Sequence, residues 1–280
     1  MLPIGINWVD GLFDDAEDQI KYMKSAGFSG TFIGSENERL PALMKVLEPA
    51  GIRVETLHAP FVTADGVGMN DIWNPGDNGE RMLRRLIDGL EKCSHYNVPK
   101  LIVHLSSGKT PPPVNDLGLE RFGRLADKAA AVGVKICFEN QRVLGNLAVA
   151  MEMFPETEFC WDTGHEECFA GGRRYMPLFG SRLGALHVQD NLGEQDKDRH
   201  MIPGDGIVNF DNAAKYIAAA GFCGTIMLEL KTKEYKDLSP EEFLSRAAQG
   251  ARLVAGKVEY YKKTLADTGS IIMSQAVKLL

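Results

Sequence analysis

Charged and imidazole side chains follow short apolar runs at several places along the chain. The run KICF leads directly to Glu139 and Asn140, and the run FCW leads to Asp162. Other short apolar runs end in the same way, at His58, His104, His187 and Glu229. A charged group directly after a buried strand is costly unless another group pairs with it or a ligand binds there. These positions therefore predict one site built from several strand ends around Glu139.

The mixture of carboxylates and imidazoles at these positions is typical of a divalent metal site. Oxygen and nitrogen donors together suit Zn²⁺, Mn²⁺, Mg²⁺ or Co²⁺, and no thiolate is needed. We expect the metal ligands to be Glu139, Asp162, His187 and Glu229. Further donors fall at or shortly after other strand ends, and these are His58, His104, His165, Asp198 and His200. His95, in contrast, lies within a predicted helix.

Eight short apolar segments alternate with helical patterns through almost the whole chain. The predicted strands are 4–9, 30–34, 53–61, 100–105, 135–140, 158–165, 183–190 and 225–230. The predicted helices are 14–26, 38–50, 80–96, 118–132, 144–153, 210–220 and 240–261. The strands lack a period of two, as expected for a parallel sheet buried on both faces. The alternation predicts an α/β fold, a single (β/α)8 TIM barrel, whose strand ends open on one face.

The domain organisation follows from this alternation. We expect one catalytic barrel domain over residues 1–261 and a C-terminal helical tail over 262–280. The Gly-, Asn- and Asp-rich segment 62–79 is expected to be a long loop, and Trp73 within it is a candidate lid residue.

Composition limits the classes of partner. The chain has 280 residues and a formal net charge of -7, which disfavours nucleic acid and anionic membranes as partners. We expect no signal peptide and no transmembrane helix. The five cysteines form no CxxC pair, which favours reduced thiols and a cytoplasmic location. No dinucleotide or P-loop glycine motif is found at a strand–helix turn.

The ordered set of strand-end motifs resembles the xylose-isomerase-like TIM-barrel superfamily, from the first strand to about residue 255. The motifs that carry the resemblance are LHAPF (57–61), VH (103–104), FEN (138–140), WDTGH (161–165), LHVQD (186–190), HMIPGDG (200–206) and LEL (228–230). That superfamily includes sugar isomerases, ketose 3-epimerases, inosose dehydratases and type IV apurinic-site endonucleases. One departure is His200, where many of the epimerases have an arginine before the PGxG turn.

The epimerase branch implies a divalent-metal-dependent isomerase or epimerase of a sugar, sugar phosphate or polyol. By that resemblance Glu139 and Glu229 are the catalytic acid and base as well as ligands. His165 is implied to contact the substrate. From the residues themselves, Trp8 and Asn140 are further candidates for substrate contact. A small sugar or polyol is then the expected partner, and barrels of this type often form homo-oligomers.

Two alternatives stay open at this point. An inosose-type dehydratase would use the same metal and base. The endonuclease branch instead implies a phosphodiesterase with three zinc ions, and the remaining zinc ligands would be His58, His104, His165, Asp198 and His200. The loops around the predicted mouth are neutral to acidic, which argues against a DNA substrate.

Overall fold

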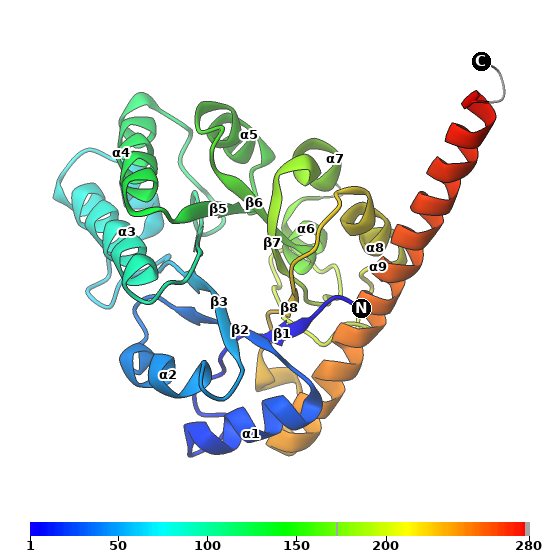
Figure 1. Cartoon of the computed structure of the whole chain (residues 1–280). Coiled ribbons are helices and arrows are strands. Elements are labelled where there is room, and N and C mark those ends of the chain that lie inside the picture. The colour runs from blue at the N-terminus through cyan, green and yellow to red at the C-terminus, as the bar shows by residue number, and fades with distance from the viewer. Residues whose placement is uncertain (172, 278–280) are drawn as a thin grey trace.

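The chain folds into eight parallel strands surrounded by helices (Figure 1). The computed structural model describes residues 1–171 and 173–277, and side chains up to residue 268. The strands are β1 (Ile4–Ile6), β2 (Gly30–Gly34), β3 (Arg53–His58), β4 (Lys100–Val103), β5 (Lys135–Glu139), β6 (Glu158–Asp162), β7 (Leu183–His187) and β8 (Ile226–Leu228). The helices are α1 (Ala16–Ala26), α2 (Leu40–Leu47), α3 (Asp77–His95), α4 (Asp116–Val132), α5 (Leu144–Met153), α6 (Thr163–Phe169), α7 (Met176–Phe179), α8 (Phe210–Ala219) and α9 (Pro240–Val277).

The strands form one sheet in the order β7-β6-β5-β4-β3-β2-β1-β8. The first and last strands of this order, β7 and β8, also meet. A parallel bridge joins Val188, directly after β7, to Leu228, the last residue of β8. The amide of Val188 donates to the Met227 carbonyl at 2.8 Å, and the Glu229 amide donates to the Val188 carbonyl at 3.2 Å. The sheet therefore closes into the predicted (β/α)8 TIM barrel, and the carboxyl ends of all eight strands face the same mouth.

Local sequence signals explain where several helices begin and end. Asp15 caps α1 by accepting a hydrogen bond from the Glu17 amide at 2.9 Å, and Asn115 caps α4 through the Gly118 amide at 2.9 Å. Both helices end at a glycine with left-handed backbone, Gly133 in the case of α4. These caps set the lengths of the helices that return the chain to the next strand.

Several predicted boundaries differ from the structure by a few residues. Two predictions near the mouth are wrong, one about a strand and one about a loop. The predicted strand 158–165 ends at Asp162, because the Asp162 side chain caps α6 by accepting from the His165 amide at 2.6 Å. His165 therefore lies in the first turn of a helix. In segment 62–79 a 3₁₀ turn forms at Met69–Trp73. Trp73 is 1% exposed and donates from Nε1 to the Leu105 carbonyl at 2.6 Å, so it belongs to the core and is no lid.

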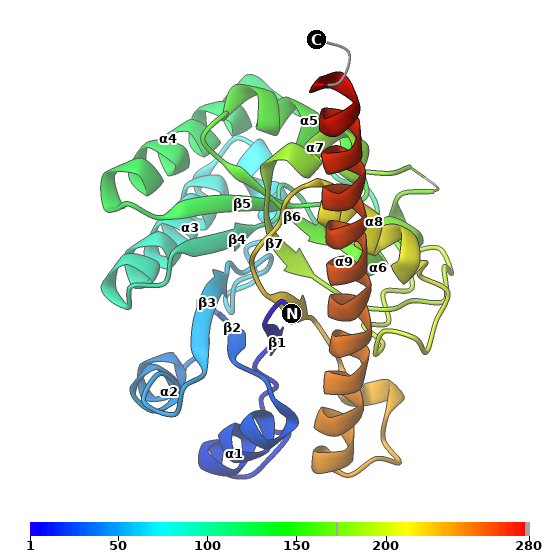
Figure 2. The ribbon, with the colours of Figure 1, turned by 45° about the vertical axis from the view of Figure 1, so that its right-hand side comes forward.

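The C-terminal helix is longer than the sequence pattern indicates. Helix α9 runs without interruption from Pro240 to Val277, packs along α8 and β1, and extends past the body of the barrel (Figures 1 and 2). The predicted tail begins inside this helix, and its last three positions, 278–280, lie outside the described residues. None of the described helices is long and apolar enough to cross a lipid bilayer.

Candidate metal centre

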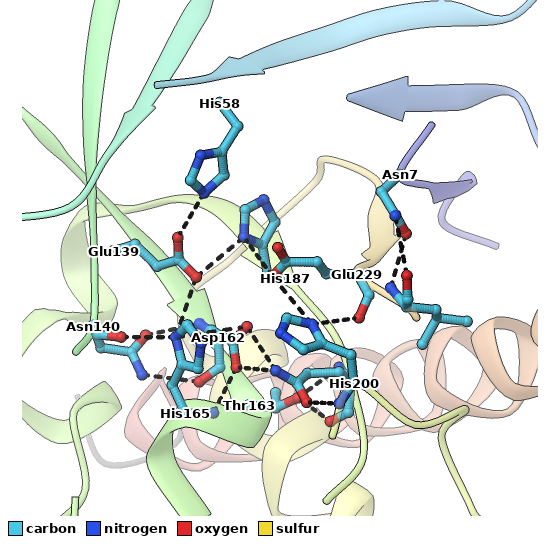
Figure 3. Close-up of polar contacts among 12 residues, drawn as sticks. Asn7, His58, Glu139, Asn140, Asp162, Thr163, His165, His187, His200 and Glu229 are labelled. Atoms are coloured by element: carbon cyan, nitrogen blue, oxygen red, sulfur yellow. Dashed lines mark hydrogen bonds and ion pairs between the residues drawn. The ribbon is translucent and has the colours of Figure 1, made fainter. Parts of the chain in front are cut away.

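Four side chains from four strand ends converge at the mouth of the barrel (Figure 3). Glu139 ends β5, Asp162 ends β6, His187 ends β7, and Glu229 directly follows β8. One donor atom of each lies within 4.8 Å of the donor atoms of the other three. We call these four residues the principal group. The first three are at most 1% exposed, so the group lies at the buried end of the site.

Glu139 is the centre of this arrangement, because imidazoles surround both of its oxygens. On Oε2, the Nε2 atoms of His58 and His104 lie at 3.2 and 2.8 Å. On Oε1, the Nδ1 atoms of His187 and His165 lie at 3.2 and 3.3 Å. The predicted convergence of histidines from separate strands on Glu139 is therefore present in the structure.

The electrostatics of the principal group follow from burial and these neighbours. Burial acts to raise the pKa of Glu139, but His187 and His104 outweigh it and hold the pKa well below the ordinary value. The pKa of Glu229 is also lowered, against burial, by His187 and His200. Burial raises the pKa of Asp162 to about 7. The surroundings thus favour the ionised form of Glu139 and Glu229 and disfavour that of Asp162.

The donor set and its unmet charge suit a divalent cation. Among the described residues, no lysine or arginine forms an ion pair with Glu139, Asp162 or Glu229. Oε2 of Glu229 is buried without a hydrogen-bond donor, although Nδ1 of His187 lies only 3.2 Å away. The oxygen and the nitrogen are therefore close together without forming a hydrogen bond. Two ligands of one metal ion have this arrangement.

Several histidines have one ring nitrogen occupied by a backbone carbonyl. Nδ1 of His58 lies 2.8 Å from the Ala59 carbonyl, and Nδ1 of His200 lies 3.1 Å from the Glu229 carbonyl. Each carbonyl needs an N–H donor, so a neutral ring directs its Nε2 lone pair at a carboxylate. A proton or a cation between the two relieves that repulsion. Metal-binding histidines are usually oriented in this way by a carbonyl on the other nitrogen.

Two further sets of donors adjoin the principal group. The second group is His165, Asp198 and His200, and the third group is His58, His104 and Glu139. In the second group, Oδ2 of Asp198 lies 2.5 Å from Nε2 of His200 and 3.5 Å from Nε2 of His165. Glu139 belongs to both the principal and the third group. The structure therefore brings together all the predicted additional donors.

A cavity of about 610 Å³ lies above these groups. Glu229, the second group, His58 and His104 line it, while Glu139, Asp162 and His187 lie beneath. Aromatic rings also line it, and these belong to Trp8, Phe32, Phe61 and Phe169. Trp8 is 7% exposed and donates from Nε1 to Oδ1 of Asp10 at 2.9 Å. The cavity offers room for a small ligand that faces polar groups below and apolar rings at the sides.

The structure places Asn140 differently from a substrate-binding residue. It is fully buried and does not line the cavity. Its Nδ2 donates to the Asp162 carbonyl at 2.9 Å, and its Oδ1 accepts from the Asp162 amide at 2.7 Å. Asn140 therefore fixes the backbone that carries Asp162. Trp8 and His165 do line the cavity, and their contact with a substrate stays a prediction.

Three residues of the site escaped the sequence analysis. Gln141 lines the cavity, with Nε2 at 3.3 Å from Nε2 of His104 and 3.2 Å from Nδ1 of His165. Gln189 contacts Asp162 and Asp198. Asp190 holds the turn after His200. The amides that donate to Asp190, at 2.8 to 2.9 Å, belong to Gly204, Gly206 and Val208. The LHVQD motif placed these last two side chains next to His187 but did not indicate their partners.

Two relatives match different shares of this chain. Inosose dehydratase of Serratia proteamaculans is 23% identical over 269 residues, which cover 85% of this chain and 89% of that protein. An uncharacterized protein of Sinorhizobium fredii, y4fM, is 35% identical over only 89 residues. That match spans 31% of this chain and 28% of y4fM.

Solved structures of low sequence identity share the fold. An L-ribulose 3-epimerase superposes with a TM-score of 0.74 at 15% identity, covering 96% of this chain and 98% of that chain. The crystal structure of the IOLI protein with a binding zinc atom superposes with a TM-score of 0.70 at 16% identity, covering 92% and 99%. The family model described as xylose isomerase-like TIM barrel matches residues 8–253, and the chain belongs to that family.

Proposed function

We propose that the chain is a divalent-metal-dependent isomerase or epimerase of a sugar, sugar phosphate or polyol. The proposal is carried by two glutamates at one cavity: Glu229 lines it, and Glu139 lies beneath it. Nδ1 of His187 lies between them, at 3.2 Å from an oxygen of each. Their strands, β5 and β8, are three places apart in the ring of eight. The two carboxylates therefore approach the centre of the mouth from different directions.

The ion would be held by the principal group, whose four members offer three oxygen donors and one nitrogen donor. Zn²⁺, Mn²⁺, Mg²⁺ and Co²⁺ all accept such a set. The zinc bound in the similar IOLI structure does not decide which of these ions this chain binds. When bound, the ion supplies Lewis-acid polarisation of a substrate carbonyl or hydroxyl.

The two glutamates would move the proton. Glu229 is the better placed to remove it from the substrate carbon, because it lines the cavity whereas Glu139 lies beneath it. Its lowered pKa favours the ionised form, which a base requires. Glu139 would return a proton, which its imidazole neighbours can supply. Trp8 would pack against the ring of the substrate, and His165 would contact a hydroxyl.

A dehydratase is a close variant, and the curated relative from Serratia supports it. The same glutamate would remove the proton, and a hydroxyl would then leave the neighbouring carbon as water with a proton from the partner acid. Product analysis separates the two reactions, since an epimerase keeps the mass of its substrate and a dehydratase loses one water.

A metal-dependent phosphodiesterase is the second candidate, because the structure assembles the second and third groups as well as the principal one. Metal analysis of the purified protein tests this candidate directly. We expect about one tightly bound divalent ion per chain for the isomerase and up to three for the phosphodiesterase.

The experiment that tests the proposed function follows the reacting hydrogen. The metal-loaded protein is incubated in deuterated water with a panel of ketoses, their phosphates and inosose. We expect one class of substrate to take up deuterium at the reacting carbon, and Glu229→Gln to abolish that uptake. Turnover without any solvent deuterium in the product, or cleavage of abasic DNA by a protein that leaves the whole panel unchanged, would contradict the proposal.

A further inference from the structure

Gln189 is a buried amide that contacts two of the carboxylates described above. It lies two residues after His187, and the alternation of an extended chain places both side chains on the same side. Its side chain is completely buried. Nε2 lies 3.2 Å from both carboxylate oxygens of Asp162 and 2.9 Å from Oδ1 of Asp198. Oε1 accepts from the His200 amide at 3.0 Å.

These contacts determine which way the amide faces. If oxygen and nitrogen were exchanged, the oxygen would face the carboxylates of Asp162 and Asp198, and the nitrogen would face the N–H of His200. Both contacts would be repulsive. The amide therefore uses its two N–H groups for one carboxylate of the principal group and one of the second group.

The turn after β6 is shaped to receive this side chain. Oγ1 of Thr163 donates to the Gln189 carbonyl at 2.7 Å and accepts from the Gln189 amide at 3.0 Å. A Cβ atom at Gly164 would lie 2.3 Å from Cδ and Oε1 of Gln189. Asp162 thus accepts from the side-chain amide of Gln189, and Thr163 binds the Gln189 backbone. The absence of a side chain at Gly164 leaves the space that the Gln189 side chain fills.

We propose that Gln189 is a positioning residue that couples the principal group to the second group. The inference rests on the proposed metal centre, but it assigns Gln189 neither a ligand nor a catalytic role. The amide holds Asp162 and Asp198 at a fixed separation, and it holds the His200 backbone at the same time. A change in the second group is therefore transmitted to Asp162, and so to the ion that the principal group binds.

The test measures the affinity for the tightest-bound zinc ion by titrating zinc chloride alone into full-length, chelator-treated protein in a calorimeter. We expect Gln189→Met, which keeps the length of the side chain, to weaken that affinity about 10–100-fold. The control is Gln19→Met, which removes another buried amide, 2% exposed and on α1, away from the cavity. It should leave the zinc affinity at the wild-type value.

A double-mutant cycle separates coupling from a general loss of structure. Asp198→Ala should weaken the tightest zinc site in the wild type and have little further effect in Gln189→Met. Additive effects would reduce Gln189 to a structural role and overturn the coupling. Gly164→Ala provides a second route, since its methyl group must displace the amide, and it should mimic Gln189→Met without adding to it.

The remaining outcomes are also decisive. Wild-type zinc affinity in Gln189→Met overturns the coupling and leaves the proposed metal centre intact. Failure of the wild-type protein to bind zinc, manganese, magnesium or cobalt overturns the metal centre itself, and the coupling with it.

Discussion

The barrel carries charged side chains at both ends, but the two ends neutralise them differently. At the amino end of the strands, Nζ of Lys100 lies 2.7 Å from Oε2 of Glu158 and donates to the Gly184 carbonyl at 2.6 Å. Both side chains are about a quarter exposed, at 26% and 29%. Both charges of this pair therefore have a partner within the protein and some access to water.

The principal group at the carboxyl end lacks such pairing. Its three carboxylates face imidazoles, and among the described residues they have no lysine or arginine partner. Glu139 and Asp162 have no exposed side-chain surface. Burying such charges costs several kcal/mol per ion unless protonated imidazoles or a bound cation neutralise them. The Lys100–Glu158 pair is neutralised within the protein, whereas we propose that a cation completes the principal group at the carboxyl end. This contrast, more than the fold, indicates which end is the functional one.

The largest effect expected from breaking this contrast is on turnover. Glu139→Gln keeps the shape of the side chain but removes a charge that interacts with four imidazoles and a carboxyl that could return a proton. We expect kcat on the substrate found in the panel to fall about 10²–10⁴-fold. The matched control at the other end is Glu158→Gln, which should keep its kcat. Near-normal turnover in Glu139→Gln would end the acid/base assignment.

Acid should weaken metal binding at the carboxyl end. The pKa of Asp162 is raised to about 7, and the pKa values of His165 and His187 are raised well above the ordinary imidazole value. A ligand must lose its proton before it binds, so protons compete more strongly as the pH falls. We expect zinc affinity to fall about tenfold per pH unit for each displaced proton below about pH 7. Calorimetry between about pH 8 and 5.5 checks this, and a flat profile would contradict it.

Metal removal should lower thermal stability, because the ion binds the principal group only in the folded state. An ion at a hundredfold excess over its dissociation constant stabilises the folded state by about 2.7 kcal/mol. For a chain of this size we expect the chelated protein to melt roughly 5–10 °C lower. Differential scanning calorimetry with and without zinc measures the shift. Lys100→Met should show the same zinc-dependent shift as the wild type, and an equal Tm with and without every metal tested would remove the basis of the contrast.

Much of the fold and of the principal group is readable from the sequence, because both depend on local patterns. The run KICF predicts β5, and the charge that follows it predicts where β5 opens into the mouth. The same reasoning fails at Asp162, where it extends the strand to His165. Asp162 is there both a predicted ligand and the cap of α6. An aspartate followed by Thr, Gly and His is a helix-start signal that could have corrected the boundary.

Gln189 shows what sequence reasoning could not supply. Its partners Asp162 and Asp198 lie 27 and 9 residues away, and nothing in the pattern LHVQD indicates that its amide joins them. Trp73 illustrates the same limit. Its segment has the composition of a loop, but the indole ring is buried. Its Nε1 donates a hydrogen bond to the carbonyl of Leu105, 32 residues away. Contacts of this kind are set by tertiary packing, which no local periodicity reports.

The smallest effect expected is on the stability of the amino end. Lys100→Met leaves Glu158 without its cation and the Gly184 carbonyl without its donor. Removing one partner of a fully buried pair typically costs 3–5 kcal/mol and of an exposed pair less than about 1. Because this pair is about a quarter exposed, we expect a loss of about 1–3 kcal/mol in urea unfolding. Zinc affinity should not change, since the pair lies at the far end of the strands. A variant with weakened zinc binding would show that the two ends are coupled and that the amino end does more than close the barrel.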